Sequence, residues 1–177
     1  MIHKILVAVD NSNNNQMLFD SAINLAQSAN ASLVLLHVIP EQEANYPILP
    51  TYAYYPELNE EDYQFYRRKF EEYKRLGTDL LQDFTDRATA AGIKCEYNQI
   101  IGHPGKTICQ EADTHKADLI LIGSRGLKGL KEMFLGSVSN YVTHHASCSV
   151  LIIRESLKHP SASNSPSSQS KNVMNNC

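Results

Sequence analysis

Short apolar runs recur along the chain and are separated by longer amphipathic stretches. The runs are rich in β-branched residues, which is typical of strands buried on both faces of a parallel sheet. We expect strands at residues 5–9, 33–39, 95–101, 118–122 and 149–153. The third of these runs is the least apolar and is expected nearer an edge. His37 lies inside the second run and is interpreted as a hydrogen-bonded core histidine.

Between the apolar runs, hydrophobic residues recur every three or four positions, which is the spacing of a helix with one buried face. Helices are expected over residues 16–29, 59–91, 104–115 and 137–146. Asn59 is a candidate N-cap of the longest helix, Gly92 stands where that helix should end, and its apolar stripe skips one turn near Gly77. Strands that alternate with helices predict an α/β fold, a doubly wound five-stranded parallel sheet with helices on both faces.

Two segments do not follow this alternation. Residues 41–58 contain three prolines and four of the nine tyrosines, and we interpret them as a partly ordered insertion loop. Its tyrosines could cover a pocket or a partner, or simply pack on the domain. Residues 155–177 are rich in serine and asparagine and have no periodicity, which predicts a disordered tail. The folded domain is therefore expected to occupy residues 1–154.

Composition and charge narrow the classes of partner. Of the 177 residues, 42% are hydrophobic, and the formal net charge is −3 with no basic cluster, so nucleic acid is not an expected partner. The apolar runs are too short for a signal peptide or a membrane span, so we expect a soluble cytoplasmic protein without membrane association. The four cysteines contain no C-x-x-C pair, and the sequence therefore carries no zinc or dithiol signature.

Residues 102–107, GHPGKT, end like a Walker A phosphate loop. That pattern needs a glycine five residues before its second glycine, and the residue found there is Ile100. Pro104 also removes a backbone N–H that should face a phosphate, whereas proline suits the first turn of a helix. We therefore interpret this segment as a turn into a helix.

A second glycine-rich segment, GSRGLKGLKEMFLGSVSN at residues 123–140, follows the fourth expected strand. Ligands of open α/β sheets bind at the carboxyl ends of strands, where the strand order reverses. Gly123, Gly126 and Gly129 would let a ligand approach the backbone closely, and Gly136-Ser137 leads into a helix whose first N–H groups could bind an anion. Ser137 and Ser139 add hydroxyl groups, and Arg125, Lys128 and Lys131 add positive charge. From this chemistry alone, a phosphate site and a solvated glycine turn remain equally open.

The spacing of this segment resembles the nucleotide loop of the universal stress protein family, G-x-x-G-x(9)-G-[ST]. Gly123 and Gly126 bracket two residues, residues 127–135 are the nine, and Gly136-Ser137 complete the pattern. The similarity extends to ILVAVDNS, LLHVIP, ADLILIGSRG and SVLIIR, and covers most of residues 1–154 apart from 41–58. The resemblance implies a universal stress protein domain with a Rossmann-like fold of the adenine nucleotide alpha hydrolase type.

Carried over by position, the resemblance to the ATP-binding branch of this family implies a site for ATP with Mg²⁺ or Mn²⁺. Ala8, Val9 and Asp10 would line the pocket, and the backbone of Val38 would contact adenine. Asp10 would also meet the metal, since hard cations prefer carboxylate oxygen. The glycine-rich segment would supply Gly123, Arg125 and Gly126 for the ribose and phosphates, and Gly136, Ser137, Val138 and Ser139 for the phosphate chain.

The resemblance also implies a homodimer that forms through the last strand, at Val150, Leu151, Ile152 and Ile153. Prolines are common on both sides of the cysteine before this strand in the family, and here Ser147 and Ser149 replace them. This departure leaves the nucleotide site untouched and concerns only the dimer edge.

Three functions remain in view at this point. The favoured one is an ATP-binding stress-response or signalling module with unknown protein partners. The second is a slow ATPase or nucleotidyl-transfer enzyme, which would need a positioned water and usually a base. The sequence places no second carboxylate, histidine or lysine beside the phosphates, and we assign no catalytic residue. The third is a nucleotide-free dimer, which the intact glycine pattern disfavours because family members that do not bind ATP typically lose it.

Overall fold

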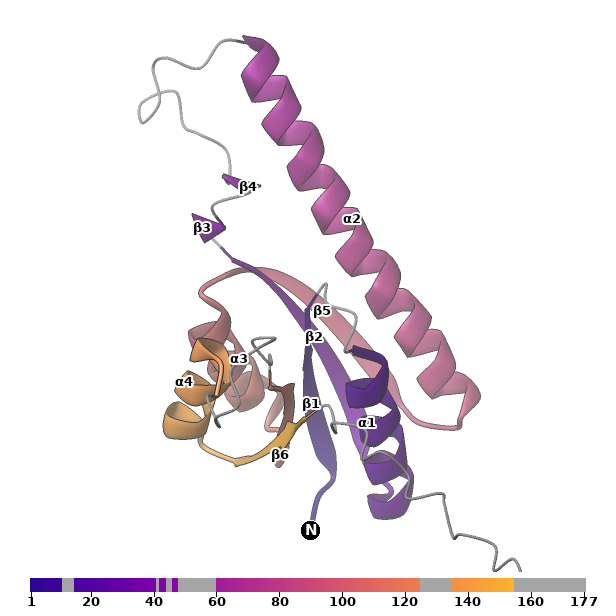
Figure 1. Ribbon diagram of the computed structural model, residues 1–177. Coiled ribbons are helices and arrows are strands. Elements are labelled where there is room, and N and C mark those ends of the chain that lie inside the picture. The colour runs from indigo at the N-terminus through magenta and orange to yellow at the C-terminus, as the bar shows by residue number, and fades with distance from the viewer. Residues whose placement is uncertain (11–14, 41, 44–45, 48–59, 125–134, 155–177) are drawn as a thin grey trace, which may run out of the picture.

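The structure is a computed structural model, and it describes residues 1–10, 15–40, 42–43, 46–47, 60–124 and 135–154. Its central sheet contains β1 (Lys4–Val9), β2 (Ser32–Pro40), β5 (Cys95–Gly102), β6 (Leu119–Gly123) and β7 (Ser149–Ile153), all parallel, in the order β5-β2-β1-β6-β7 (Figure 1). Two short antiparallel strands, β3 (Gln42–Glu43) and β4 (Tyr46–Pro47), lie within the expected insertion loop. The rest of that loop, the candidate cap Asn59, and the tail at residues 155–177 lie outside the described residues.

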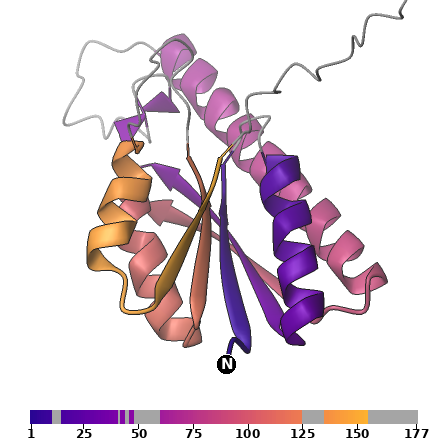
Figure 2. The ribbon, with the colours of Figure 1, turned by 60° about the horizontal axis from the view of Figure 1, so that its bottom comes forward.

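The described helices cover both faces of this sheet. They are α1 (Asn15–Ala29), α2 (Glu60–Ala90), α3 (Pro104–His115) and α4 (Ser137–His145). Figures 1 and 2 show α1 and α2 on one face, with α3 and α4 on the other. Alternate residues of each strand face opposite helix pairs: Ile5 and Val7 pack with α1 and α2, while Leu6 and Ala8 pack with α3 and α4. The predicted doubly wound α/β fold is confirmed.

One predicted strand begins a residue too early. Asp118 was expected inside the fourth strand, but β6 starts at Leu119. The Asp118 carboxylate instead accepts hydrogen bonds from the backbone N–H groups of His3 (2.7 Å) and Lys4 (3.0 Å), which lowers the pKa of its carboxyl group. This side chain therefore joins the beginnings of β1 and β6, a long-range role that an apolar run does not reveal.

Helix α2 has 31 residues, and its N-terminal half extends past the end of the sheet in Figure 1. It ends where glycine predicts. Gly92 has φ 78°, the Gly92 N–H donates to Thr89 O (2.9 Å), and the Ile93 N–H donates to Ala88 O (3.0 Å). These two bonds cap the last carbonyls of the helix in a Schellman motif.

The skipped turn at Gly77 lies over a buried histidine. A Cβ at Gly77 would lie 2.4 Å from His37 Nδ1 and 2.5 Å from Gln99 Nε2, so only glycine lets α2 approach β2 this closely. His37 is fully buried, which lowers the pKa of its imidazole and favours the neutral form. The expectation of a core histidine is thus correct as to burial.

The hydrogen bonds around His37 identify its tautomer. Gln99 Nε2 lies 2.9 Å from the carbonyl oxygen of Lys74, and because a carbonyl only accepts, this atom must be the amide nitrogen. The same nitrogen lies 3.1 Å from His37 Nδ1, which therefore accepts and leaves the proton on Nε2. Within the described part of the chain, Nε2 has no hydrogen-bond partner. The sequence predicted a hydrogen-bonded histidine, and this prediction is correct for Nδ1 only.

The strand order places a crevice at the carboxyl ends of the central strands. From β1 the chain proceeds to β2 on one side, and it later returns through β6 on the other side. The strand order therefore reverses between β1 and β6, and their carboxyl ends form the place where such folds bind ligands. None of the described helices is long and apolar enough to cross a membrane.

Candidate functional site

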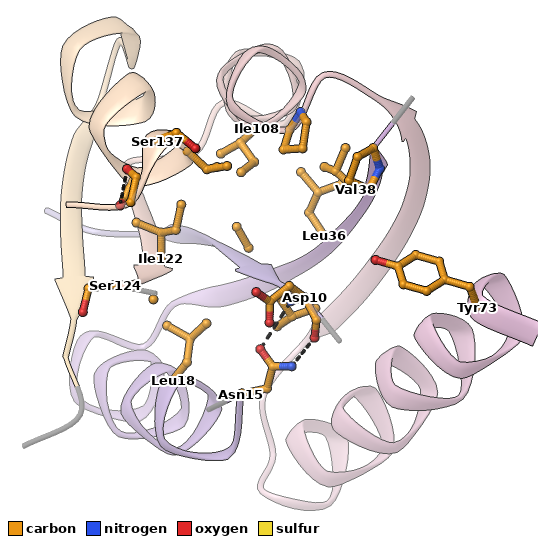
Figure 3. Close-up of a pocket in the computed structure, with 18 residues that line it drawn as sticks. Asp10, Asn15, Leu18, Leu36, Val38, Tyr73, Ile108, Ile122, Ser124 and Ser137 are labelled. Carbon is orange, nitrogen blue, oxygen red and sulfur yellow. Dashed lines mark hydrogen bonds between the residues drawn. The ribbon is translucent and has the colours of Figure 1, made fainter. Parts of the chain in front are cut away.

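A pocket with a volume of about 240 Å³ opens at the carboxyl ends of β1, β2 and β6 (Figure 3). Nine of the residues expected from the sequence line it: Ala8, Val9, Asp10, Val38, Gly123, Gly136, Ser137, Val138 and Ser139. Arg125 and Gly126, the other two, lie outside the described residues. The structure therefore brings together segments that are more than 100 positions apart in the chain, because parallel strands place their carboxyl ends side by side.

One end of the pocket is formed by the beginning of α4. Gly136 is the N-cap, with φ −58° and ψ 156°, and no side chain caps the helix. The first intrahelical bond joins the Asn140 N–H to Gly136 O (2.9 Å), so the N–H groups of the preceding turn have no partner within the helix. Ser139 is 2% exposed, and its hydroxyl donates to Gly136 O (3.1 Å). This end combines N–H groups that have no partner within the helix with the positive end of a helix dipole, which suits an anion.

The middle of the pocket is apolar. Leu36 and Val38 come from β2, Ile108 from α3 and Ile122 from β6, and Figure 3 shows them around the central space. A slot of aliphatic side chains between a few polar groups is typical of sites for flat organic molecules.

The segment GHPGKT contributes to this slot without forming a phosphate loop. Helix α3 starts at Pro104, as predicted, and the proline ring lines the pocket. A Cβ at Gly105 would lie 2.8 Å from Tyr141 Cδ1, so this glycine serves the packing of α3 against α4. Thr107 is buried, and its backbone N–H donates to His103 O (2.9 Å). Neither Lys106 nor Thr107 lines the pocket.

Asp10 lies at a second polar side of the pocket and is held by Asn15. The Asp10 N–H donates to Asn15 Oδ1 (3.3 Å), and Asn15 Nδ2 donates to Asp10 O. Asn15 is only 6% exposed and is the first residue of α1. Sequence reasoning missed Asn15, although an asparagine at a helix start shortly after a strand is a known backbone-bonding signal.

Ser124 and Tyr73 also line the pocket and were not expected. Ser124 directly follows β6, and its N–H donates to Ile153 O (2.8 Å), so it continues the strand pairing by one residue. The sequence signal that could have identified Ser124 is its position directly after Gly123, which was itself expected in the pocket. Tyr73 comes from α2, which covers the sheet face opposite to α3 and α4, and it reaches the pocket from that side (Figure 3).

The comparison with protein families gives one match that covers most of the chain. The model of the universal stress protein family matches residues 1–154. The chain belongs to this family. The universal stress protein Sll1388 of Synechocystis is 38% identical over 151 residues, which are 85% of this chain and 97% of that protein. The universal stress protein YxiE of Bacillus subtilis is 36% identical over 154 residues, 87% of this chain and 100% of the relative.

Solved structures of universal stress proteins share the fold. UspA of Lactobacillus plantarum superposes with a TM-score of 0.68 at 24% identity, over 86% of this chain and 98% of that one. A family protein of Arabidopsis thaliana, solved with AMP bound, gives a TM-score of 0.62 at 25% identity over 90% and 97% of the two chains. A universal stress protein in complex with cAMP gives 0.56 at 27% identity over 86% and 97%.

Proposed function

We propose that this universal stress protein binds an adenine nucleotide, ATP foremost, and acts as a nucleotide-dependent module in stress response or signalling. The observation that carries the proposal is the pocket itself. It joins an apolar slot to the N-terminus of α4, at the point where the strand order reverses. The complexes of two relatives with AMP and cAMP support the adenine nucleotide as the class of ligand.

The two ends of the pocket suit different parts of such a ligand. The purine belongs in the apolar slot, where the backbone of Val38 is proposed to contact its edge. The phosphates belong at Gly136, Ser137 and Ser139, where N–H groups at the start of α4 and the Ser137 hydroxyl can donate hydrogen bonds. Arg125 and Gly126 follow Gly123 and Ser124 in the chain and are proposed to complete the ribose and phosphate contacts.

Asp10 is the proposed protein ligand of a Mg²⁺ or Mn²⁺ ion that accompanies the nucleotide. In the described part of the chain, no three His, Cys, Asp or Glu side chains are grouped as a metal site. A cation carried by a nucleotide needs only one or two carboxylates, because phosphate oxygens and water supply the other ligands. Asp10 fits this requirement, and the ion would neutralise phosphate charge.

We propose binding rather than turnover as the main activity. Among the described lining residues, Asp10 is the one carboxylate and none is a histidine or lysine. Among these described residues, only Asp10 could serve a slow ATPase as a base, and it is already the proposed metal ligand. The nucleotide that remains bound after purification separates the cases: ATP supports binding with little turnover, whereas ADP or AMP leaves binding intact and calls for a direct assay of ATP hydrolysis.

A homodimer through β7 is proposed as the assembly. Strand β7 lies at one edge of the described sheet, pairs with β6, and exposes 37% of Leu151. Val150, Ile152 and Ile153 in the same strand are only partly buried. An apolar edge strand is a liability in a monomer, and a second copy of the same strand would cover it.

The proposed function is tested by blocking the pocket at Gly123. A Cβ added there meets no atom of the described residues within 4 Å, so Gly123→Val adds a side chain to the pocket lining at a place where its Cβ has room. We expect calorimetric affinity for ATP to fall by roughly tenfold or more, about 1.4 kcal/mol, while the melting temperature stays unchanged. The control Lys106→Ala, outside the pocket, should keep full affinity. Equal affinity of Gly123→Val and the unaltered protein would refute the site.

A further inference from the structure

Helix α2 places Tyr73 at the side of the pocket that lies across from α4. Figure 3 shows the ring extending from the helix with its hydroxyl directed into the space beside Asp10 and Val38, whereas Ser137 stands at the opposite side. The strand ends and residues of α1, α3 and α4 supply the rest of the described lining. Tyr73 thus adds a phenol to a site whose other walls come from elsewhere in the chain.

Packing against His37 fixes the position of Tyr73. Its ring lies 5.8 Å from the ring of His37, at an interplanar angle of 41°. His37 is fully buried, and Gln99 links it to the backbone of α2 at Lys74, the residue next to Tyr73. One turn further along the same face, Gly77 leaves the space that His37 occupies. Packed side chains therefore hold the phenol of Tyr73 in place, and its position does not depend on a loop.

The chemistry on this side of the pocket differs from that at α4. The Tyr73 phenol can both donate and accept a hydrogen bond, so it suits hydroxyl and amino groups. Such groups belong to the nucleoside part of a nucleotide, its ribose and its base edge. The anionic phosphates are matched instead by the N-terminus of α4, across the pocket.

We propose that the Tyr73 hydroxyl hydrogen-bonds the nucleoside part of the bound nucleotide and so helps to determine specificity. This inference rests on the proposed nucleotide-binding function. It carries a quantitative consequence, because a contact to the nucleoside contributes equally whatever the number of phosphates. Loss of the hydroxyl should weaken AMP, ADP and ATP by the same factor, roughly three- to tenfold for a neutral hydrogen bond.

The test uses Tyr73→Phe, which removes the hydroxyl and keeps the ring that packs on His37. Affinities for AMP, ADP and ATP are measured by titration calorimetry on the full chain. Ser137→Ala, at the phosphate end, should show a loss that grows from AMP to ATP. Tyr97→Phe is the matched control, because the Tyr97 hydroxyl donates to Gln82 Oε1 (3.1 Å) and does not line the pocket.

The outcomes separate this inference from the function on which it rests. Equal losses for the three nucleotides in Tyr73→Phe, with no loss in Tyr97→Phe, support the proposed contact. If the unaltered protein binds the nucleotides and Tyr73→Phe binds them equally well, the inference alone is overturned. A loss that rises with phosphate number would also overturn it, since Tyr73 would then serve the phosphates. If the unaltered protein binds none of the three, the proposed function fails and the inference fails with it.

Discussion

Gly77→Ala is expected to destabilise the protein although it improves the helix. In an exposed helix interior, alanine is about 1 kcal/mol more favourable than glycine. Gly77 is buried against β2, and the new Cβ would lie 2.4 Å from His37 Nδ1 and 2.5 Å from Gln99 Nε2. Carbon and nitrogen atoms pack at about 3.5 Å, so one of these groups must move.

The magnitude follows from which group can move. The imidazole of His37 is fully buried and cannot swing aside, and overpacking of this kind costs about 1–3 kcal/mol. The Gln99 amide could rotate away only by giving up its bond to Lys74 O, at about 1 kcal/mol. After the helical gain of about 1 kcal/mol is subtracted, the free energy of unfolding should fall by about 1–3 kcal/mol.

Urea unfolding of four proteins measures this effect: the unaltered chain, Gly77→Ala, His37→Ala and the double variant. With the imidazole removed, Gln99 has room to turn, and the alanine at position 77 fills part of the vacated space. Gly77→Ala should then become neutral or stabilising by up to about 1 kcal/mol, a reversal of sign within one double-mutant cycle. If Gly77→Ala raises the stability of the otherwise unaltered chain, the close contact of α2 with His37 is wrong.

Two further predictions concern pH and assembly. Burial lowers the pKa of His37 below its ordinary 6.5 in the folded state, with Asp10 partly opposing the shift, so the unfolded chain binds the proton more readily. The stabilisation from neutral His37 is full above about pH 6.5 and is lost as pH falls towards the folded pKa, by up to about 1.4 kcal/mol per pH unit. Urea unfolding should therefore give a lower free energy of unfolding at pH 5 than at pH 7.5. In His37→Gln, this difference between the two pH values should be smaller. Leu151→Arg, which places a charge on the exposed edge of β7, should convert a dimer to monomers in light scattering without loss of helical circular dichroism. A Leu151→Arg protein with the mass of the unaltered dimer would contradict the β7 interface.

The central strands β1, β2 and β6 could be predicted from sequence because they are buried on both faces of the sheet. Ile5 and Leu6 point to opposite helix layers, and both are fully buried, so an unbroken apolar run is the physical requirement of the position. The pocket residues at 8–10 and 136–139 could be expected from the family resemblance. Each set is contiguous in the chain, at the end of β1 or the start of α4, so a short family motif contains the whole set. The role of Asp118 could not be predicted in this way, because its hydrogen-bond partners, His3 and Lys4, are 115 and 114 positions away in the chain.

Tyr73 escaped for a different reason, which also indicates how it could have been found. In an apolar stripe with helical spacing, Phe70 and Tyr73 are equivalent, and the pattern does not show which one meets a pocket on the far side of the sheet. That depends on where a 31-residue helix crosses β2. Gly77 carries this information, since a glycine in a helix interior costs about 1 kcal/mol and is favoured where another side chain comes close. Because α2 runs antiparallel to the strands, the residue one turn before Gly77 must lie nearer the carboxyl end of β2, where the pocket is. The skipped turn and the unpredicted pocket residue are therefore two consequences of one helix crossing.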